Sequence, residues 1–484
     1  MLLNSISFLL FFTVFFVLYW FVLNKTNKQQ NILLLVTSYL FYYLTDWRFL
    51  SLLIGVSILN FVLAILIEKT INTFHRRILV IIGLLQGIGG LVYFKYYNFF
   101  IKSFNEVFKA VNITWNLHSL SIIVPVGISF FTFRTISYLL DVDKGKVKAT
   151  KDWIVFFNYV SFFPCILSGP IDKAKVFIHQ LETKKKFEYK SAMIGLRQIL
   201  WGLFKKVVIA DSCAVVTDQV FDNFQVYPAS SILLVTFLYS IQIYADFSGY
   251  SDMAIGISRL IGYNITQNFH YPFFAQNIAD FWRRWHISLT SWLTEYVFTP
   301  LNTRFRDYGN LGLILAIVIN FTICGIWHGA NWTYVLFGFL HGCYFIPLII
   351  KGTMNKKKKN ATLNTSPSRK EIFDILKTFT IVMFTFVIFR ANTIDQAFNL
   401  YKALLSTSLI SFPSMPLGAI NTLIIISYVF IMLAIEWKER NQIFALEKIS
   451  LHWSKTKKTI FYYCLIISVI YFSGSEQKFI YLQF

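Results

Sequence analysis

Long apolar runs separated by short polar stretches extend along almost the whole chain of 484 residues. The runs lie at Ile6–Leu23, Asn31–Leu44, Ser51–Ile67, Ile78–Phe94, Ser119–Leu140, Trp153–Gly169, Ser191–Ala210, Ser230–Ala245, Leu311–Ile350, Thr378–Phe389, Gly418–Ile435 and Thr459–Ser473. Within lipid the backbone must satisfy its own hydrogen bonds, and the runs lack the two-residue alternation of barrel strands. The pattern therefore predicts an all-α polytopic membrane protein with roughly ten to thirteen transmembrane helices.

Basic residues between the runs predict the orientation of these helices, because Lys and Arg favour the cytoplasmic side. The N-terminus carries no charged side chain before Lys25 and is predicted outside, whereas the loops at 144–151 and 173–190 are rich in lysine and predicted inside. Both flanks of Trp153–Gly169 are then cytoplasmic, so this run is predicted to be re-entrant. Counting onward places the C-terminus outside as well.

The same pattern gives the expected organisation of the chain. We expect a single transmembrane domain over residues 1–484. Its parts are N-terminal helices (1–118), a core (119–350), a basic cytoplasmic linker (351–375), C-terminal helices (376–473) and an extracytoplasmic tail (474–484).

Composition agrees with a membrane protein and narrows its partners. Hydrophobic residues make up 56% of the chain and charged residues 14%, against about 25% charged in soluble domains. The net charge of +21 falls in loops between apolar runs, which favours the lipid bilayer as partner and argues against nucleic acid. The five cysteines form no CxxC, and there is no HExxH or Cys/His cluster. We therefore expect no metal site.

One histidine, His328, lies in the longest uncharged stretch of the chain, residues 311–350. An ionisable ring at membrane depth is a candidate functional residue, and neutral imidazole can take a proton from a hydroxyl and return it. By itself such a histidine is more often a packing residue. Gly325 and Gly329 leave room beside it for a substrate or a close helix, and Asn331 is a polar group able to orient it.

Polar residues also gather in the segment 244–252, which contains Asp246, Ser248, Tyr250 and Asp252. Carboxylates at the end of an apolar run must be solvated or paired. The segment therefore predicts either the wall of a cavity or a helix terminus with Ser and Asp caps. The two interpretations are compatible.

A third polar segment, 280–290, combines aromatic and basic residues. Trp282, Trp285 and Leu289 share one helical face, and Arg283, Arg284 and Ser288 turn away from it. Guanidinium groups pair bidentately with phosphate, so the two arginines are candidates for binding a phosphate-bearing donor. The alternative is an interfacial helix that only anchors the chain.

Taken in order, these segments resemble a known family. The residues that carry the resemblance are Asp246–Asp252, Phe281–Ser288, Trp327–Gly329, Pro125–Phe133, Ser168–Ile171 and the C-terminal Phe479–Phe484. They resemble the membrane-bound O-acyltransferases (MBOAT), in particular the bacterial alginate and peptidoglycan O-acetylases. The resemblance covers nearly the whole chain, and its ordered set of motifs is highly specific.

The resemblance implies a fold and a site. In that family the histidine of Trp-His-Gly is catalytic, which here is His328 beside Trp327, and the histidine of Arg-Arg-Trp-His, here His286, is a supporting polar residue. The implied fold is a ring of helices around a thinned core, with a funnel from each side meeting at the histidine. The implied donor enters from the cytoplasm, and the acceptor comes from outside.

The aromatic tail suggests a further step. A tyrosine hydroxyl can form an acyl ester and pass the acyl group on, so Tyr481 is a candidate relay. The alternative is that the tail only packs as part of an interfacial aromatic belt.

Together these features predict an O-acetyltransferase of the bacterial cytoplasmic membrane. We expect acetyl-CoA or another acyl thioester as donor, with no tightly bound cofactor. The expected acceptor is a cell-envelope polysaccharide, reached directly or through an extracytoplasmic SGNH-hydrolase-like transferase. Transfer of D-alanine to teichoic acid remains an alternative. Non-catalytic polysaccharide export is another, although we find no internal inverted repeat of the kind common in transporters.

Overall fold

A computed structural model describes residues 1–354, 367–448, 453–474, 477 and 479–480. Throughout these residues the regular structure is helical, which confirms the all-α prediction. The chain forms two compact units. The first contains residues 1–195 and 257–266, and the second contains residues 196–256 and 267–484. The prediction of a single domain over 1–484 stays a prediction.

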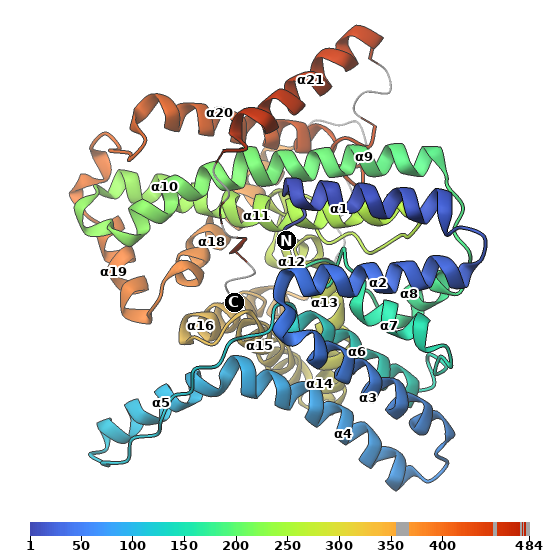
Figure 1. The fold of residues 1–484 in the computed structure, drawn as a ribbon. Helices are drawn as coiled ribbons and strands as arrows, with labels where there is room; N and C mark the ends of the chain where they lie inside the picture. Colours follow the sequence, from blue (N-terminus) through green and yellow to red (C-terminus); the bar gives the residue numbers. More distant parts are fainter. Residues whose placement is uncertain (355–366, 449–452, 475–476, 478, 481–484) are drawn as a thin grey trace. The chain divides into compact units, whose positions relative to one another are not determined.

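The first unit is built from the N-terminal helices (Figure 1). Its helices are α1 (Ile6–Val17), α2 (Asn27–Asp46), α3 (Leu50–Lys69), α4 (Thr73–Leu91), α5 (Tyr97–Ala110), α6 (Ile128–Asp143), α7 (Trp153–Ser161) and α8 (Ala174–Leu181). The N-terminus of α2 is fixed by a capping box, in which the Thr26 hydroxyl accepts from the amide of Gln29 and the Gln29 side chain accepts from the amide of Thr26. Helices α3 and α4 pack against each other and against α6.

Two predicted runs of this unit are shorter as helices than their apolar sequence suggested. The run Ser119–Leu140 becomes helical only at Ile128, after Gly127 with φ +76°. A Cβ on Gly127 would lie 2.3 Å from the carbonyl oxygen of Ile166, so this chain reversal needs glycine. In the run Trp153–Gly169, helix α7 ends at Ser161 after nine residues. Such a helix is too short to cross a bilayer, in agreement with a re-entrant segment.

The second unit holds the longest helix and the C-terminal helices (Figure 1). Its helices are the end of α9 (Tyr189–Leu203), α10 (Asp211–Asp222), α11 (Ala229–Leu260, to Gly256 in this unit), α12 (Ile278–Arg284), α13 (Ile287–Leu293), α14 (Thr299–Arg304), α15 (Gly309–His328), α16 (Trp332–Cys343), α17 (Ile346–Ile350), α18 (Arg369–Arg390), α19 (Ile394–Leu404), α20 (Gly418–Lys438) and α21 (Lys455–Phe472). A π-helical stretch, Phe204–Ala210, joins α9 to α10 without a break.

Seven helical segments of the described residues are long and apolar enough to cross a membrane, so this is a multi-pass membrane protein. They are fewer than the ten to thirteen helices predicted. One reason is that the segment Asn27–Lys69, which counts once among the seven, contains two helices, α2 and α3, and covers two predicted runs. Another is that the run Ser191–Ala210 is not among the seven segments. It contains Lys205 and Lys206, whose side chains are buried inside the protein.

Candidate functional site

His328 is the last residue of α15 and lies against α16, which packs along α15 as the second arm of a helical hairpin. Its side chain is buried, with ring centroids of Phe389 and Phe337 at 5.3 and 6.2 Å. A Cβ on Gly325 would lie 2.1 Å from the carbonyl oxygen of Tyr334. The space that this glycine leaves near His328 is therefore filled by the close approach of α16.

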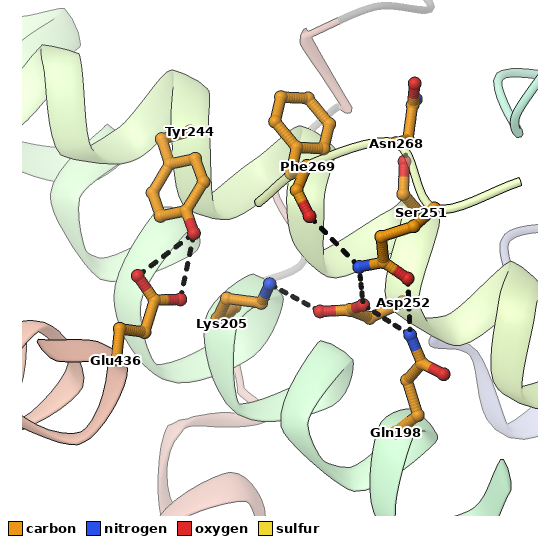
Figure 2. A network of polar contacts seen from close by, with 9 residues as sticks. Gln198, Lys205, Tyr244, Ser251, Asp252, Asn268, Phe269 and Glu436 are labelled. Atoms are coloured by element: carbon orange, nitrogen blue, oxygen red, sulfur yellow. Dashed lines mark hydrogen bonds and ion pairs between the residues drawn. The ribbon is translucent and has the colours of Figure 1, made fainter. Parts of the chain in front are cut away.

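His286 lies at a break between α12 and α13 and has left-handed backbone angles, φ +45°. Asn268 holds this break, because its carbonyl oxygen accepts from the amide of Ile287 at 2.8 Å and its side-chain oxygen accepts from the Ser288 hydroxyl at 2.9 Å. The amide nitrogen of Asn268 in turn donates to the Ser251 hydroxyl (Figure 2). This network holds the backbone at the break that carries His286.

The predicted single amphipathic helix over 280–290 is therefore wrong in two respects. The segment is two short helices rather than one, and Ser288 is buried and hydrogen-bonded rather than turned away. Trp282, Trp285 and Leu289 are buried, so the segment is part of the protein core and not an interfacial anchor. The break arises because hydrogen bonds from an asparagine outside the segment replace helical ones.

The two histidines converge on the same buried aromatic cluster. The indole of Trp327 has its ring centroid 5.6 Å from that of His286 and 5.1 Å from that of His328. The ring of Phe247 on α11 meets His286 edge-on at 4.6 Å. Burial lowers the pKa of His286 well below its ordinary value, and the nearby His328 lowers it further. The three sequence motifs thus meet at one place, around a neutral imidazole.

Helix α11 presents its acidic motif from mid-helix rather than from an end, so the predicted helix-terminus interpretation is wrong. Asp252 binds the ammonium group of Lys205 at 2.5 Å and accepts from the amide of Gln198 at 2.8 Å (Figure 2). All three side chains are buried. Pairing of this kind is what makes buried charge tolerable.

A second buried ion pair lies beside the first. Asp246 binds the ammonium group of Lys206 at 2.7 Å, and Lys206 also binds Asp211 at 2.8 Å. These three side chains are buried as well. The carboxylates of α11 are therefore neutralised by two lysines of the π-helical stretch and are not solvated.

The π-helical stretch explains how two consecutive lysines both face α11. A π-turn inserts an extra residue into a helix and commonly occurs at functional sites. Close approach is possible because Gly202 and Gly249 face each other: a Cβ on Gly249 would lie 2.8 Å from the carbonyl oxygen of Gly202. Lys205 and Lys206 were not predicted as site residues. Their position in an apolar run could have identified them, because a buried ammonium group needs an acidic partner.

The remaining polar residues of the motif are buried in the same helix. Ser248 and Tyr250 are at most 3% exposed. Tyr244 lies one turn before Ser248 on α11, and its hydroxyl donates to the carboxylate of Glu436 on α20 at 2.9 Å (Figure 2). The segment is thus a buried polar strip along α11. Its interpretation as the wall of a cavity stays a prediction.

The last described residues of the chain contact this strip. The amide of Ile480 donates to the second carboxylate oxygen of Asp246 at 2.8 Å, and Lys206 donates to the carbonyl oxygen of Gln477 at 3.4 Å. Both bonds involve backbone atoms of the tail. The tail is therefore held at the second ion pair.

An aromatic contact lies next to these hydrogen bonds. The ring of Phe479 stacks on Tyr250 with centroids 4.9 Å apart. Phe479 and Ile480 are both buried. Tyr481, the predicted relay residue, lies outside the described residues.

A cavity of about 170 Å³ opens near His328. Arg283, Trp282, Asn320 and Cys324 are among the residues that line it. The thiol of Cys324 lies 3.9 Å from Nε2 of His328, so the cavity reaches one turn of α15 from the catalytic candidate. Within the described part of the chain, the buried side-chain oxygen of Asn320 accepts no hydrogen bond.

The two arginines share one acidic partner. Arg284 lies 3.1 Å and Arg283 3.8 Å from the carboxylate of Asp280. The Arg283 side chain is 45% exposed and lines the cavity, whereas Arg284 is more buried. Of the two, Arg283 is therefore better placed to meet a ligand.

Two further polar residues have structural contacts around α16. Asn331 caps the N-terminus of this helix by accepting from the amide of Thr333, and its amide nitrogen donates to the carbonyl oxygen of Asn392 at 2.7 Å. Asn331 therefore stabilises the start of α16, and its predicted role in orienting His328 stays a prediction. His341 is buried and accepts from the indole N–H of Trp282 at 3.2 Å.

Comparison with known proteins identifies the family. Residues 3–389 match the membrane-bound O-acyltransferase (MBOAT) family. The chain therefore belongs to this family of O-acyltransferases, as a multi-pass membrane protein.

Three relatives bear on its chemistry. The chain is 35% identical to the probable alginate O-acetylase AlgI of Pseudomonas aeruginosa, over 83% of this chain and 74% of that protein. It is 30% identical to the peptidoglycan O-acetyltransferase of Helicobacter pylori, over 96% of this chain and 94% of that protein. It is also 30% identical to the teichoic acid D-alanyltransferase of Streptococcus thermophilus, over 57% of this chain and 70% of that protein.

Proposed function

We propose that the protein takes an acetyl group from a cytoplasmic thioester donor, acetyl-CoA, and transfers it to a hydroxyl acceptor. The acetyl group finally reaches a cell-envelope polysaccharide. His328 is the general base. The observation that carries the proposal is the convergence of His328 and His286 around Trp327 in a buried pocket of rings. The similarity to two polysaccharide O-acetylases over most of the chain supports the acetyl group and the acceptor class.

The chemistry needs one proton carrier. His328 takes the proton of the attacking hydroxyl as its oxygen bonds to the acetyl carbon, and the carbon–sulfur bond of the donor breaks. The proton then passes to the departing thiolate, so that thiol and ester are the products and His328 returns to its neutral form.

The cavity lined by Arg283 and Cys324 is the proposed route of the donor. In this proposal the guanidinium of Arg283, which lines the cavity, pairs with a phosphate of CoA. The pantetheine arm of CoA contains amides, and the side-chain oxygen of Asn320 is a buried acceptor for such an N–H. The thioester would then arrive beside Cys324 and His328.

Tyr481 is the proposed relay from this site to the acceptor. The buried contacts of Phe479 and Ile480 support this role, since they anchor the chain next to the motif on α11 rather than in an interfacial belt. In this proposal both termini lie on the extracytoplasmic face of the bacterial cytoplasmic membrane. An SGNH-hydrolase-like transferase there receives the acetyl group from Tyr481.

Replacing the base tests the proposal. We expect His328→Ala to reduce base-labile acetate on the envelope polymers by at least about 100-fold, the order expected for loss of general base catalysis, while the protein still inserts and folds. His341→Asn is the matched control, because His341 is also buried on the same hairpin but serves Trp282. Acetate at the wild-type level in His328→Ala would refute the assignment. Labelled D-alanine appearing on teichoic acid instead would favour the alternative donor.

A second experiment tests the relay. We expect Tyr481→Phe to abolish transfer to the polysaccharide, because phenylalanine keeps the ring but lacks the hydroxyl that carries the ester. Mass spectrometry of the C-terminal peptide from protein incubated with acetyl-CoA should show an added acetyl group in the wild type alone. Full activity of Tyr481→Phe would exclude the relay and leave the role of His328 untouched.

A further inference from the structure

The two buried ion pairs between the π-helical stretch and α11 differ in one respect. Asp252 satisfies its oxygens with Lys205 and with the side-chain amides of two glutamines. Asp246 gives one oxygen to Lys206 and the other to the backbone amide of Ile480. The second pair thus binds a segment from the far end of the chain, whereas the bonds of Asp252 among the described residues go to Lys205, Gln198 and Gln267.

Aromatic contacts reinforce this binding. Phe479 stacks on Tyr250, lies 6.3 Å from the ring of Phe247, and has the ammonium of Lys206 5.8 Å from its centroid. Phe247 in turn meets His286. The tail is therefore held by charge-assisted hydrogen bonds and by the buried ring of Phe479. The ring of Phe247 lies between Phe479 and His286.

We propose that the buried Lys206–Asp246 pair is a docking clamp for the C-terminal tail. Lys206 and Asp246 are positioning residues in this role. The consequence for catalysis rests on the proposed relay, because Tyr481 follows Ile480 directly in the sequence. The clamp bonds to backbone groups, which recur at every residue, so the register of the tail is set by the buried ring of Phe479 stacked on Tyr250.

Lys206 has a second acidic partner, which makes the clamp testable. If Asp246 is replaced, Asp211 still pairs with Lys206, so the buried ammonium is not left without a counter-charge. We therefore expect Asp246→Ala and Asp246→Asn to release the tail without unfolding the unit. Asp246→Asn should release it less, since an amide oxygen still accepts from Ile480 but more weakly than a carboxylate.

Hydrogen exchange of the full-length protein in nanodiscs, without donor or acceptor, measures this directly. The peptide containing Ile480 should exchange roughly tenfold faster or more in Asp246→Ala than in wild type, with Asp246→Asn between them. Asp211→Asn is the matched control, because it removes the other carboxylate that pairs with Lys206 and leaves Asp246 with its bond to Ile480. Its Ile480 peptide should exchange at the wild-type rate.

Two outcomes would overturn the clamp. One is unchanged exchange of the Ile480 peptide in Asp246→Ala, and the other is equal acceleration by Asp211→Asn, which would indicate general loosening around Lys206 rather than loss of the bond between Asp246 and Ile480. A photo-crosslinking residue at position 479 of the otherwise unchanged chain gives an independent check, since it should capture the peptide containing Tyr250, and its failure to do so would also count against the clamp. Failure of the relay leaves these results unaltered, because no acyl transfer takes place in either measurement.

Discussion

Among single residues, buried polar groups carry most of the information about function. His328 and His286 share one aromatic cluster, although His328 ends the long helix α15 and His286 lies at the break between α12 and α13. His328 was recognisable from its uncharged surroundings. The left-handed backbone of His286 was not, because Asn268 imposes it through hydrogen bonds that no local pattern records.

Protonation of His286 should make stability depend on pH. Its pKa is lowered in the folded protein, so below the ordinary value of about 6.5 the unfolded state binds the proton more readily. The contribution to stability is present above that pH and is lost as pH falls. We expect thermal unfolding temperatures to drop between about pH 7.5 and 5, and to drop less in His286→Asn, which tolerates the left-handed backbone. Identical slopes for both proteins would contradict this.

Between helices, close approach determines how the site is assembled. Gly202 and Gly249 let the two helical segments that carry the ion pairs touch, and Gly325 does the same for the α15–α16 hairpin. The apolar runs predicted that helices would be present. They could not show which faces meet, because nearly every face of such a helix is hydrophobic.

Substitution of Gly249 tests this packing. Gly249→Ala places a Cβ 2.8 Å from the carbonyl oxygen of Gly202, so backbone must move. We expect a loss of about 1–3 kcal/mol in the free energy of unfolding, as for other overpacked cores. Gly89→Ala on α4 is the control, since it meets nothing within 4 Å and alanine favours helix. Equal unfolding temperatures for the two variants would argue against close packing at Gly249.

For the molecule as a whole, the amino-acid sequence was enough to establish the class. Long apolar runs require helices in lipid, and the ordered motifs indicated an acyltransferase with His328 at its centre. The folded structure was needed to show that Lys205 and Lys206 are buried, that the acidic motif lies in mid-helix, and that the tail docks on Asp246. The physical reason is the range of the interactions. Hydrophobicity acts residue by residue and is visible in the sequence, whereas ion pairs and hydrogen bonds depend on which distant groups the fold brings within about 3 Å.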